Sequence, residues 1–174
     1  MNLSAASGTA STLGALGAGT GGRNININNG GTLSLTSNNV LGGPGLTAAN
    51  LPTINIDSGG TLTSTRYNPV GNLTLNGGTL MQSSTDTGSF LGYVFLGSVT
   101  ATNTSGTSTI SSGNGKGNHL RGAATTTFSV ASGGTLLISN PLINGSGDYA
   151  GAGSLNKTGP GTLALRVCRT YEVR

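Results

Sequence analysis

The clearest pattern in the chain is a short alternation of apolar and polar residues, then a glycine pair, then a second alternation. The first copy reads Arg23-Asn-Ile-Asn-Ile-Asn28, Asn29-Gly30-Gly31 and Thr32-Leu-Ser-Leu-Thr36. Successive side chains of a strand point to opposite faces, so the pattern predicts strand, turn and strand with isoleucine and leucine on one face. The glycine pair allows a positive φ at a sharp corner, and the adjacent asparagine tolerates the same backbone region.

This unit is repeated. Copies follow at residues 53–63, 72–81 and 127–138, and its second half returns at 161–165. The second glycines of the pairs are Gly31, Gly60, Gly78 and Gly134. The interval from Gly78 to Gly134 is about twice that from Gly31 to Gly60, so we expect one degenerate unit inside it, with Tyr93–Leu96 and Ser108–Ile110 as its strands. We interpret the segments between copies, such as Ser37–Asn50 and Arg66–Gly71, as polar connections.

A loose period in the twenties, short strands and no helical period predict an all-β fold, a parallel β-helix (β-solenoid) with irregular loops. Each unit is too polar to bury its own apolar face, but stacked coils about 4.8 Å apart would form a continuous core. A β-sandwich also has many short strands, yet the repeated identity of the corner favours the solenoid. The side chains predicted to point inward are Ile25, Ile27, Leu33, Leu35, Ile54, Ile56, Leu62, Leu73, Leu75, Leu80, Phe128, Val130, Leu136, Leu163 and Leu165.

The repeats divide the chain into three parts. Residues 1–22 are rich in Gly, Ala, Ser and Thr and are predicted to be a linker or a ragged first coil. Residues 23–165 form the β-helix repeat segment. Residues 166–174 are an atypical tail that holds three of the eight basic residues and the single cysteine, Cys168. We expect this tail to lie outside the stack, because burial of an unpaired guanidinium is costly.

The composition narrows the function classes. Charged residues make up 7% of the chain, against about 25% in an average protein, and glycine supplies 32 of the 174 residues. Half of the net charge of +4 comes from the tail, and no basic stripe is present, so we expect no nucleic-acid partner. Residues 1–20 have neither the basic start nor the apolar core of a signal peptide, so an export signal would have to lie in a longer parent chain.

Residues suited to catalysis are few. His119 lies in a polar, Gly/Asn-rich stretch and is predicted to be an exposed loop residue. The carboxylates are Asp57, Asp86, Asp148 and Glu172. Asp57 and Asp86 are separated by about one coil, but only Asp57 precedes a glycine corner, so we do not expect them to stack into an acid/base pair. The sequence therefore predicts no catalytic residues, no metal site and no cofactor.

The sequence does not match three known ligand-binding patterns. The chain lacks the aspartate ladder of calcium-binding nonapeptide repeats. Gly113-Asn-Gly-Lys-Gly117 lacks the Gly-Lys-Ser/Thr ending and the following helix of a phosphate loop. Pairs such as Thr61/Thr63 and Thr125/Thr127 are typical of ice-binding solenoids, which present flat threonine arrays. The uneven spacing of the copies predicts that such an array would not be in register, and that these threonines simply favour β structure on the outer face.

The run from Leu155 to Leu165 resembles the autotransporter-associated β-strand repeat, also called the passenger-associated transport repeat. That family's pattern is approximately L-x-K-x-G-x-G-T-L-x-L. The resemblance implies a right-handed parallel β-helix in secreted or surface-displayed bacterial proteins, where the repeat supports passenger export. After Leu165 the family continues with a Gly-Asn-Thr-Tyr-Thr-Gly-like segment that is missing here, which predicts a truncated or frame-shifted end. The matching residues are Leu155, Lys157, Gly159, Gly161, Thr162, Leu163 and Leu165.

We therefore expect a structural passenger or stalk segment of an exported bacterial protein, located outside the cell or on its surface, with no catalysis. The alternative is an adhesin-type binding module that contacts glycans or host surface proteins. A more distant alternative is a polysaccharide-active β-helix enzyme. An outer-membrane barrel or anchor is expected as a partner only if a longer parent chain carries it.

Overall fold

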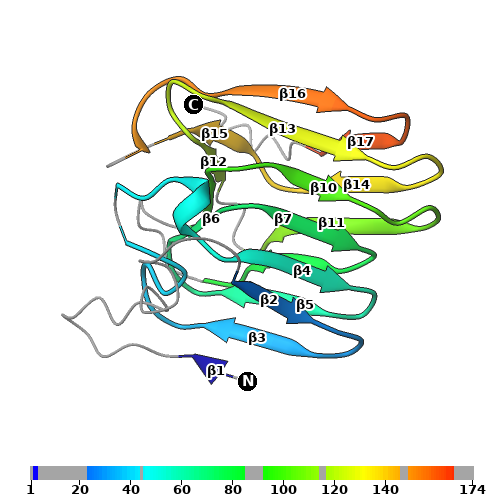
Figure 1. Cartoon of the computed structure of the whole chain (residues 1–174), viewed down its shortest axis with the longest axis horizontal. Helices are drawn as coiled ribbons and strands as arrows, with labels where there is room; N and C mark the ends of the chain where they lie inside the picture. Colours follow the sequence, from blue (N-terminus) through cyan, green and yellow to red (C-terminus); the bar gives the residue numbers. More distant parts are fainter. Residues whose placement is uncertain are drawn as a thin grey trace, which may run out of the picture.

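The protein is a parallel β-solenoid, as the repeats predict, and Figure 1 shows its coils stacked one above the other. The computed structural model describes residues 2–3, 23–43, 45–84, 92–113, 117–145 and 149–166. Within these residues the chain forms strands and one short 3-10 helix, and it forms no α-helix.

Three parallel sheets form the walls of the solenoid. Sheet A contains β1 (Asn2–Leu3), β3 (Thr32–Leu35), β5 (Thr61–Ser64), β8 (Thr79–Gln82), β11 (Thr107–Ser112), β14 (Thr135–Ile138) and β17 (Thr162–Leu165). Sheet B contains β2 (Asn24–Ile27), β4 (Thr53–Asp57), β7 (Leu73–Asn76), β10 (Val99–Ala101), β13 (Thr125–Val130) and β16 (Ser154–Thr158). Sheet C contains β6 (Asn68–Val70), β9 (Tyr93–Phe95), β12 (Asn118–Leu120) and β15 (Leu142–Asn144).

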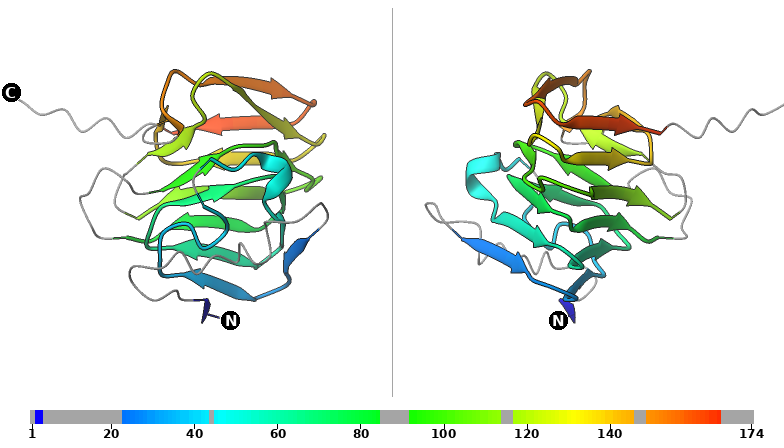
Figure 2. Two further views of the ribbon diagram at one scale, coloured as in Figure 1. Left: turned by 60° about the vertical axis from the view of Figure 1, so that its left-hand side comes forward. Right: turned by 90° about the vertical axis from the view of Figure 1, so that its right-hand side faces the viewer.

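From β4 to β15, each coil runs from a strand of sheet B through a corner into sheet A, and then through a connection of variable length into sheet C. At the corners, Gly30, Gly59 and Gly133 have φ between 72° and 77°, the left-handed region that glycine adopts without strain. The right panel of Figure 2 views the stack from the side on which these corners lie. The 3-10 helix η2 (Ala48–Asn50) belongs to the connection between β3 and β4.

The uneven repeat spacing does not disturb the pairing of the strands. Leu33 pairs with Leu62, and Leu62 pairs with Leu80, although the second interval in the sequence is much shorter than the first. The same row continues to Ile110 and Ile138. Differences in coil length are therefore taken up by the corners and connections, while the hydrogen-bonded ladders stay continuous.

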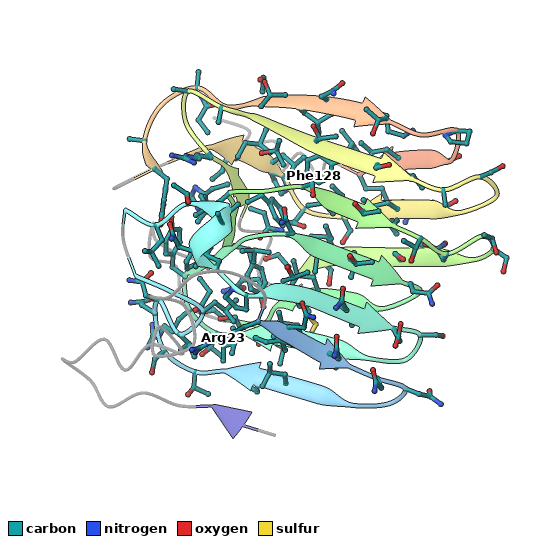
Figure 3. All side chains as sticks on the ribbon, viewed as in Figure 1. Arg23 and Phe128 are labelled. Carbon is teal, nitrogen blue, oxygen red and sulfur yellow. The ribbon has the colours of Figure 1, made fainter. Side chains whose placement is uncertain are left out.

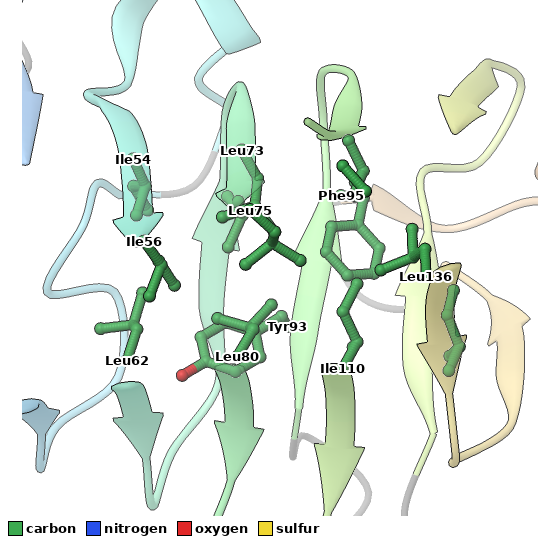
Figure 4. Packing of buried hydrophobic residues seen from close by; sticks show 14 of the residues in the cluster. Ile54, Ile56, Leu62, Leu73, Leu75, Leu80, Tyr93, Phe95, Ile110 and Leu136 are labelled. Carbon is green, nitrogen blue, oxygen red and sulfur yellow. The ribbon is translucent and has the colours of Figure 1, made fainter. Parts of the chain in front are cut away.

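The core consists of rows in which each coil contributes one apolar side chain (Figure 4). One row of sheet B runs Ile54, Leu73, Val99 and Phe128, all buried. Phe128 also packs edge-on against Phe95 of sheet C, with ring centroids 5.8 Å apart. Such rows explain how a chain with so few apolar residues forms a core: neighbouring coils supply the contacts that one coil lacks.

The inward-facing residues predicted from the sequence are buried in the inner coils. The exceptions belong to the outermost described coils: Ile25 and Leu163 are half-buried, and Leu165 is 52% exposed. The prediction was wrong for Leu165. Its strand β17 pairs only with β14, so among the described residues no further coil covers its other side.

The degenerate unit predicted between Gly78 and Gly134 is present. Its strands are β10 and β11, and the candidate Ser108–Ile110 lies in β11. The candidate Tyr93–Leu96 was wrong, because it contains β9, which belongs to sheet C. The prediction that Arg66–Gly71 is a polar connection was wrong, because this segment contains β6. The strands of sheet C are three residues long and β6, β9 and β12 are buried throughout, so they show no alternation that could reveal them.

The two ends of the chain are described in part. In β1, Asn2 and Leu3 pair with Ser34 and Leu35 of β3. Residues 4–22 and 167–174 lie outside the described residues, so the predicted linker and tail stay predictions. Arg166 is exposed, and its backbone N–H donates to the carbonyl of Ile138 at 2.8 Å, which extends the ladder of β17 by one residue.

Candidate functional site

The residues that carry the family resemblance form the last described coil. Leu155 and Lys157 belong to β16, Gly159 and Gly161 form the corner, and Thr162–Leu165 is β17. The coil pairs with β13 through β16 and with β14 through β17. The motif is therefore a complete unit of strand, corner and strand, and its role in this structure is to build a coil.

The glycines of this motif are required by the corner. Gly159 has φ of 75°, in the same left-handed region as the earlier corners. A Cβ on Gly161 would collide with the backbone carbonyl oxygen of Ala131 in the neighbouring coil. Gly134 meets the same restriction against the carbonyl of Asn103. Stacked corners thus approach too closely for a side chain at this position.

Lys157 occupies a position that is apolar in the other coils. It pairs with Phe128, at the end of the inward row of sheet B. Its Nζ donates to the carbonyl oxygens of Thr158 at 2.8 Å and Gly159 at 2.6 Å. The ammonium group is therefore turned back to the corner of its own coil, as long cationic side chains commonly do at the boundary of an apolar region.

The prediction that His119 is an exposed loop residue was wrong. His119 lies in the middle of β12 and is 2% exposed. Its Nδ1 lies 3.2 Å from the carbonyl oxygen of Asn144, and its ring packs edge-on against Tyr67 with centroids 5.8 Å apart. The polar neighbours of His119 in the sequence concealed a strand whose two faces are both covered.

Aromatic and apolar side chains from distant parts of the chain form a second, small cluster, made of Tyr67, Val94 and Tyr149 with Leu96 packed against it. Val94 pairs with His119 in sheet C. The hydroxyl of Tyr149 donates to the carbonyl of Gly43 at 3.3 Å, across 106 residues of sequence. Because His119 and its neighbours are buried, this cluster indicates a packing role rather than an accessible reaction site.

The described residues do not bring acidic groups together. Asp57, at the end of β4, is exposed and is the only carboxylate among them, because Asp86, Asp148 and Glu172 lie outside the described part of the chain. In that part, no three His, Cys, Asp or Glu side chains lie close enough to hold a metal ion. Gly113–Gly117 cannot be assessed as a loop, because residues 114–116 are also outside it.

A buried asparagine organises the corner between sheets A and C. Asn68 Oδ1 accepts the backbone N–H groups of Val40 at 2.7 Å and Leu41 at 3.3 Å, and its Nδ2 donates to Ser37 O and Ser64 Oγ at 3.1 and 3.0 Å. In sheet C, Asn118 occupies the same row as Asn68, two coils away.

The two asparagines differ in how well they are satisfied. Asn118 Oδ1 accepts the N–H of Tyr93 at 2.9 Å, but its buried Nδ2 has no hydrogen-bond partner within the described ranges. Asn68 therefore holds the segment after β3 against β6 through both its side-chain oxygen and its side-chain nitrogen, whereas Asn118 makes a hydrogen bond only through its oxygen. The Asn68 cluster is a structural device that the sequence pattern alone did not reveal.

The outer face of sheet A carries a track of threonines. Thr32, Thr61, Thr79 and Thr109 are paired in successive strands. At β11 the track moves two residues along the strand, to Thr107, and continues through Thr135 and Thr162. The expectation that such threonines would not form an array in register is therefore confirmed in part: the row from Thr32 to Thr109 is in register, but it is displaced by two residues at β11, and Thr63 pairs with Ser34 and Met81.

The outer face of sheet B is even more regular. One row pairs an outward polar side chain from each of the six strands: Asn26, Asn55, Thr74, Thr100, Ser129 and Thr158. Two residues earlier in each coil lies a second outward row: Asn24, Thr53, Asn72, Ser98, Thr127 and Asn156. We call these two rows the amide–hydroxyl face. Its side chains project from the front of the stack in Figure 3.

Comparison with known proteins adds no relative. No family model, no curated protein and no solved structure matches this chain. A search of the described residues also finds no helix with the length and apolarity needed to cross a membrane.

Proposed function

We propose that the chain is a structural β-solenoid segment of an exported bacterial surface protein, where it supports export and display without catalysis. The observation that carries this proposal is the core of continuous rows, in which each coil is completed by its two neighbours. A protein built in this way can fold coil by coil as it emerges on the far side of a membrane, because the rows of the main core join each coil to the coils next to it.

The surface supports the same proposal. The outer faces of sheets A and B consist mainly of Thr, Ser and Asn, which solvate the protein without charge. The resemblance of Leu155–Leu165 to the passenger-associated repeat points to the same class of protein. The structural motif built by these residues is the coil itself, which is the element that an elongated stalk repeats.

Surface display of a tag tests this proposal. The full chain is placed between a bacterial export signal with an epitope tag and an outer-membrane anchor, and the tag is measured on intact cells with an antibody. We expect efficient display, and a strong loss for Leu75→Asp, which buries a charge in the core. Thr74→Asp adds the same charge on the outer face of the same strand and is expected to keep display. Equal display of both variants would contradict a role of the folded stack.

An adhesin-type module is the second candidate, and the amide–hydroxyl face is the observation that favours it. Amides and hydroxyls are the groups that bind sugar hydroxyls through hydrogen bonds. A glycan array probed with the full chain separates the two candidates. Saturable binding that Thr100→Lys removes would establish the binding module, whereas efficient display without glycan binding supports the structural segment.

A further inference from the structure

We propose that the amide–hydroxyl face of sheet B is an ice-binding surface. The face consists of two outward rows, and every position in them is Asn, Thr or Ser. The row from Asn26 to Thr158 is paired across all six strands, and in the other row Asn72 and Ser98 directly precede β7 and β10. Strand pairing spaces the coils by about 4.8 Å, and positions two apart along a strand are separated by about 6.6 Å. The protein thus holds hydrogen-bonding groups on a two-dimensional lattice whose repeats resemble those of oxygen atoms on the surface of hexagonal ice.

The outward rows of sheet B are more regular than the fold requires, as a comparison with sheet A shows. On sheet A the threonine track shifts by two residues at β11 and is then flanked by Leu137 and Ala164, so an interrupted lattice is compatible with the fold. On sheet B the row from Asn26 to Thr158 runs from β2 to β16 without a shift and without an apolar residue. Strand propensity accounts for threonine, but asparagine is disfavoured in strands and yet recurs on this face.

Contacts along the rows hold some of these side chains in place. Asn55 Nδ2 donates to Asn26 Oδ1 at 2.8 Å. The hydroxyl and the backbone N–H of Ser98 both donate to Asn72 Oδ1, each at 3.2 Å. A crystalline ligand cannot adapt to a mobile surface, so side chains fixed from coil to coil suit it better than free ones.

The chemistry of the face selects among ligands. Neither row contains a charged residue, and Asp57 lies next to the rows as a single exposed carboxylate at the end of β4, so the face offers little attraction to charged polymers. Every Phe and Tyr among the described residues is buried, which leaves no exposed ring there on which a sugar could stack. A neutral lattice of donors and acceptors without aromatic rings matches a ligand that is itself such a lattice, and ice has this property.

Ice partitioning of the full chain tests the proposal. Ice is grown slowly on a cold finger from a dilute solution, and the protein concentration in the ice is compared with that in the remaining liquid. We expect wild type to be enriched in the ice relative to a protein that ice excludes. Thr100→Lys, in the middle of the face, should lower the enrichment several-fold, because one protruding side chain lifts a rigid ligand away from its neighbours. Ser132→Lys adds the same charge at an exposed corner and should bind ice like wild type.

Circular dichroism and thermal melting establish that each variant is folded. Exclusion of the wild-type protein from ice would overturn the proposal. So would equal loss of enrichment in the Ser132→Lys variant, because the effect would then come from charge and not from the lattice. Thr109→Lys on the outer face of sheet A separates the two faces: retained binding supports the assignment to sheet B, and lost binding contradicts it. Retention of wild type on insoluble cellulose with no enrichment in ice would overturn it as well and identify a glycan surface instead.

Discussion

Replacement of Leu75 by alanine tests whether stability is local in this stack. Leu75 is fully buried in β7, where it lies in register between Ile56 and Ala101. The change removes three carbon atoms, each worth about 0.8 kcal/mol on transfer from water. The methyl group of Ala101 cannot fill the space that is left, so a cavity term adds to the loss. We expect a total destabilisation of about 3–4 kcal/mol, within the range measured for buried leucines.

The location of the effect is the sharper prediction. Because the core around Leu75 is formed with the neighbouring coils, hydrogen exchange measured by mass spectrometry should accelerate most in residues 53–112 and least in residues 135–166. Thr74→Ala, on the outer face of the same strand, is the matched control and should change stability by less than about 0.5 kcal/mol. A uniform acceleration over residues 23–166 would refute the reasoning and indicate one globally cooperative core.

Three more predictions rest on particular contacts and on the tail. Asn68→Ala should lower the free energy of unfolding by about 2–3 kcal/mol in urea titrations, because it leaves buried backbone N–H groups unpaired, and Asn118→Ala should cost clearly less. Burial raises the pKa of Tyr93, so the folded state keeps a proton that the unfolded state releases. Stability should therefore fall as the pH rises above about 10, and less steeply in Tyr93→Phe, when urea midpoints at different pH are compared. Removal of residues 166–174 should change thermal stability by less than about 0.5 kcal/mol and abolish any oxidant-dependent dimer formed through Cys168, whereas unfolding of β17 would show that the tail is a cap.

The sequence by itself determined the two walls of the solenoid that carry the alternation. Isoleucine and leucine two residues apart, next to glycines that tolerate a positive φ, were sufficient to predict most strands of sheets A and B and most of their inward residues, but not β10. The missing unit was also predictable, because a doubled interval between corners leaves room for one more coil. These features are local: they depend on the period of a strand and on the backbone freedom of glycine.

Only the tertiary structure decided the third wall and the surfaces. Sheet C has strands of three residues, most of them covered on both faces, so no alternation marks them, and His119 was mistaken for a loop residue for this reason. The bond from Asn68 to Val40 joins distant positions of the chain, which no local pattern predicts. The alignment of the outer rows depends on corners and connections of different length that absorb the uneven spacing. Register between coils is a property of the stacked backbone, and the spacing of the repeats does not reveal it.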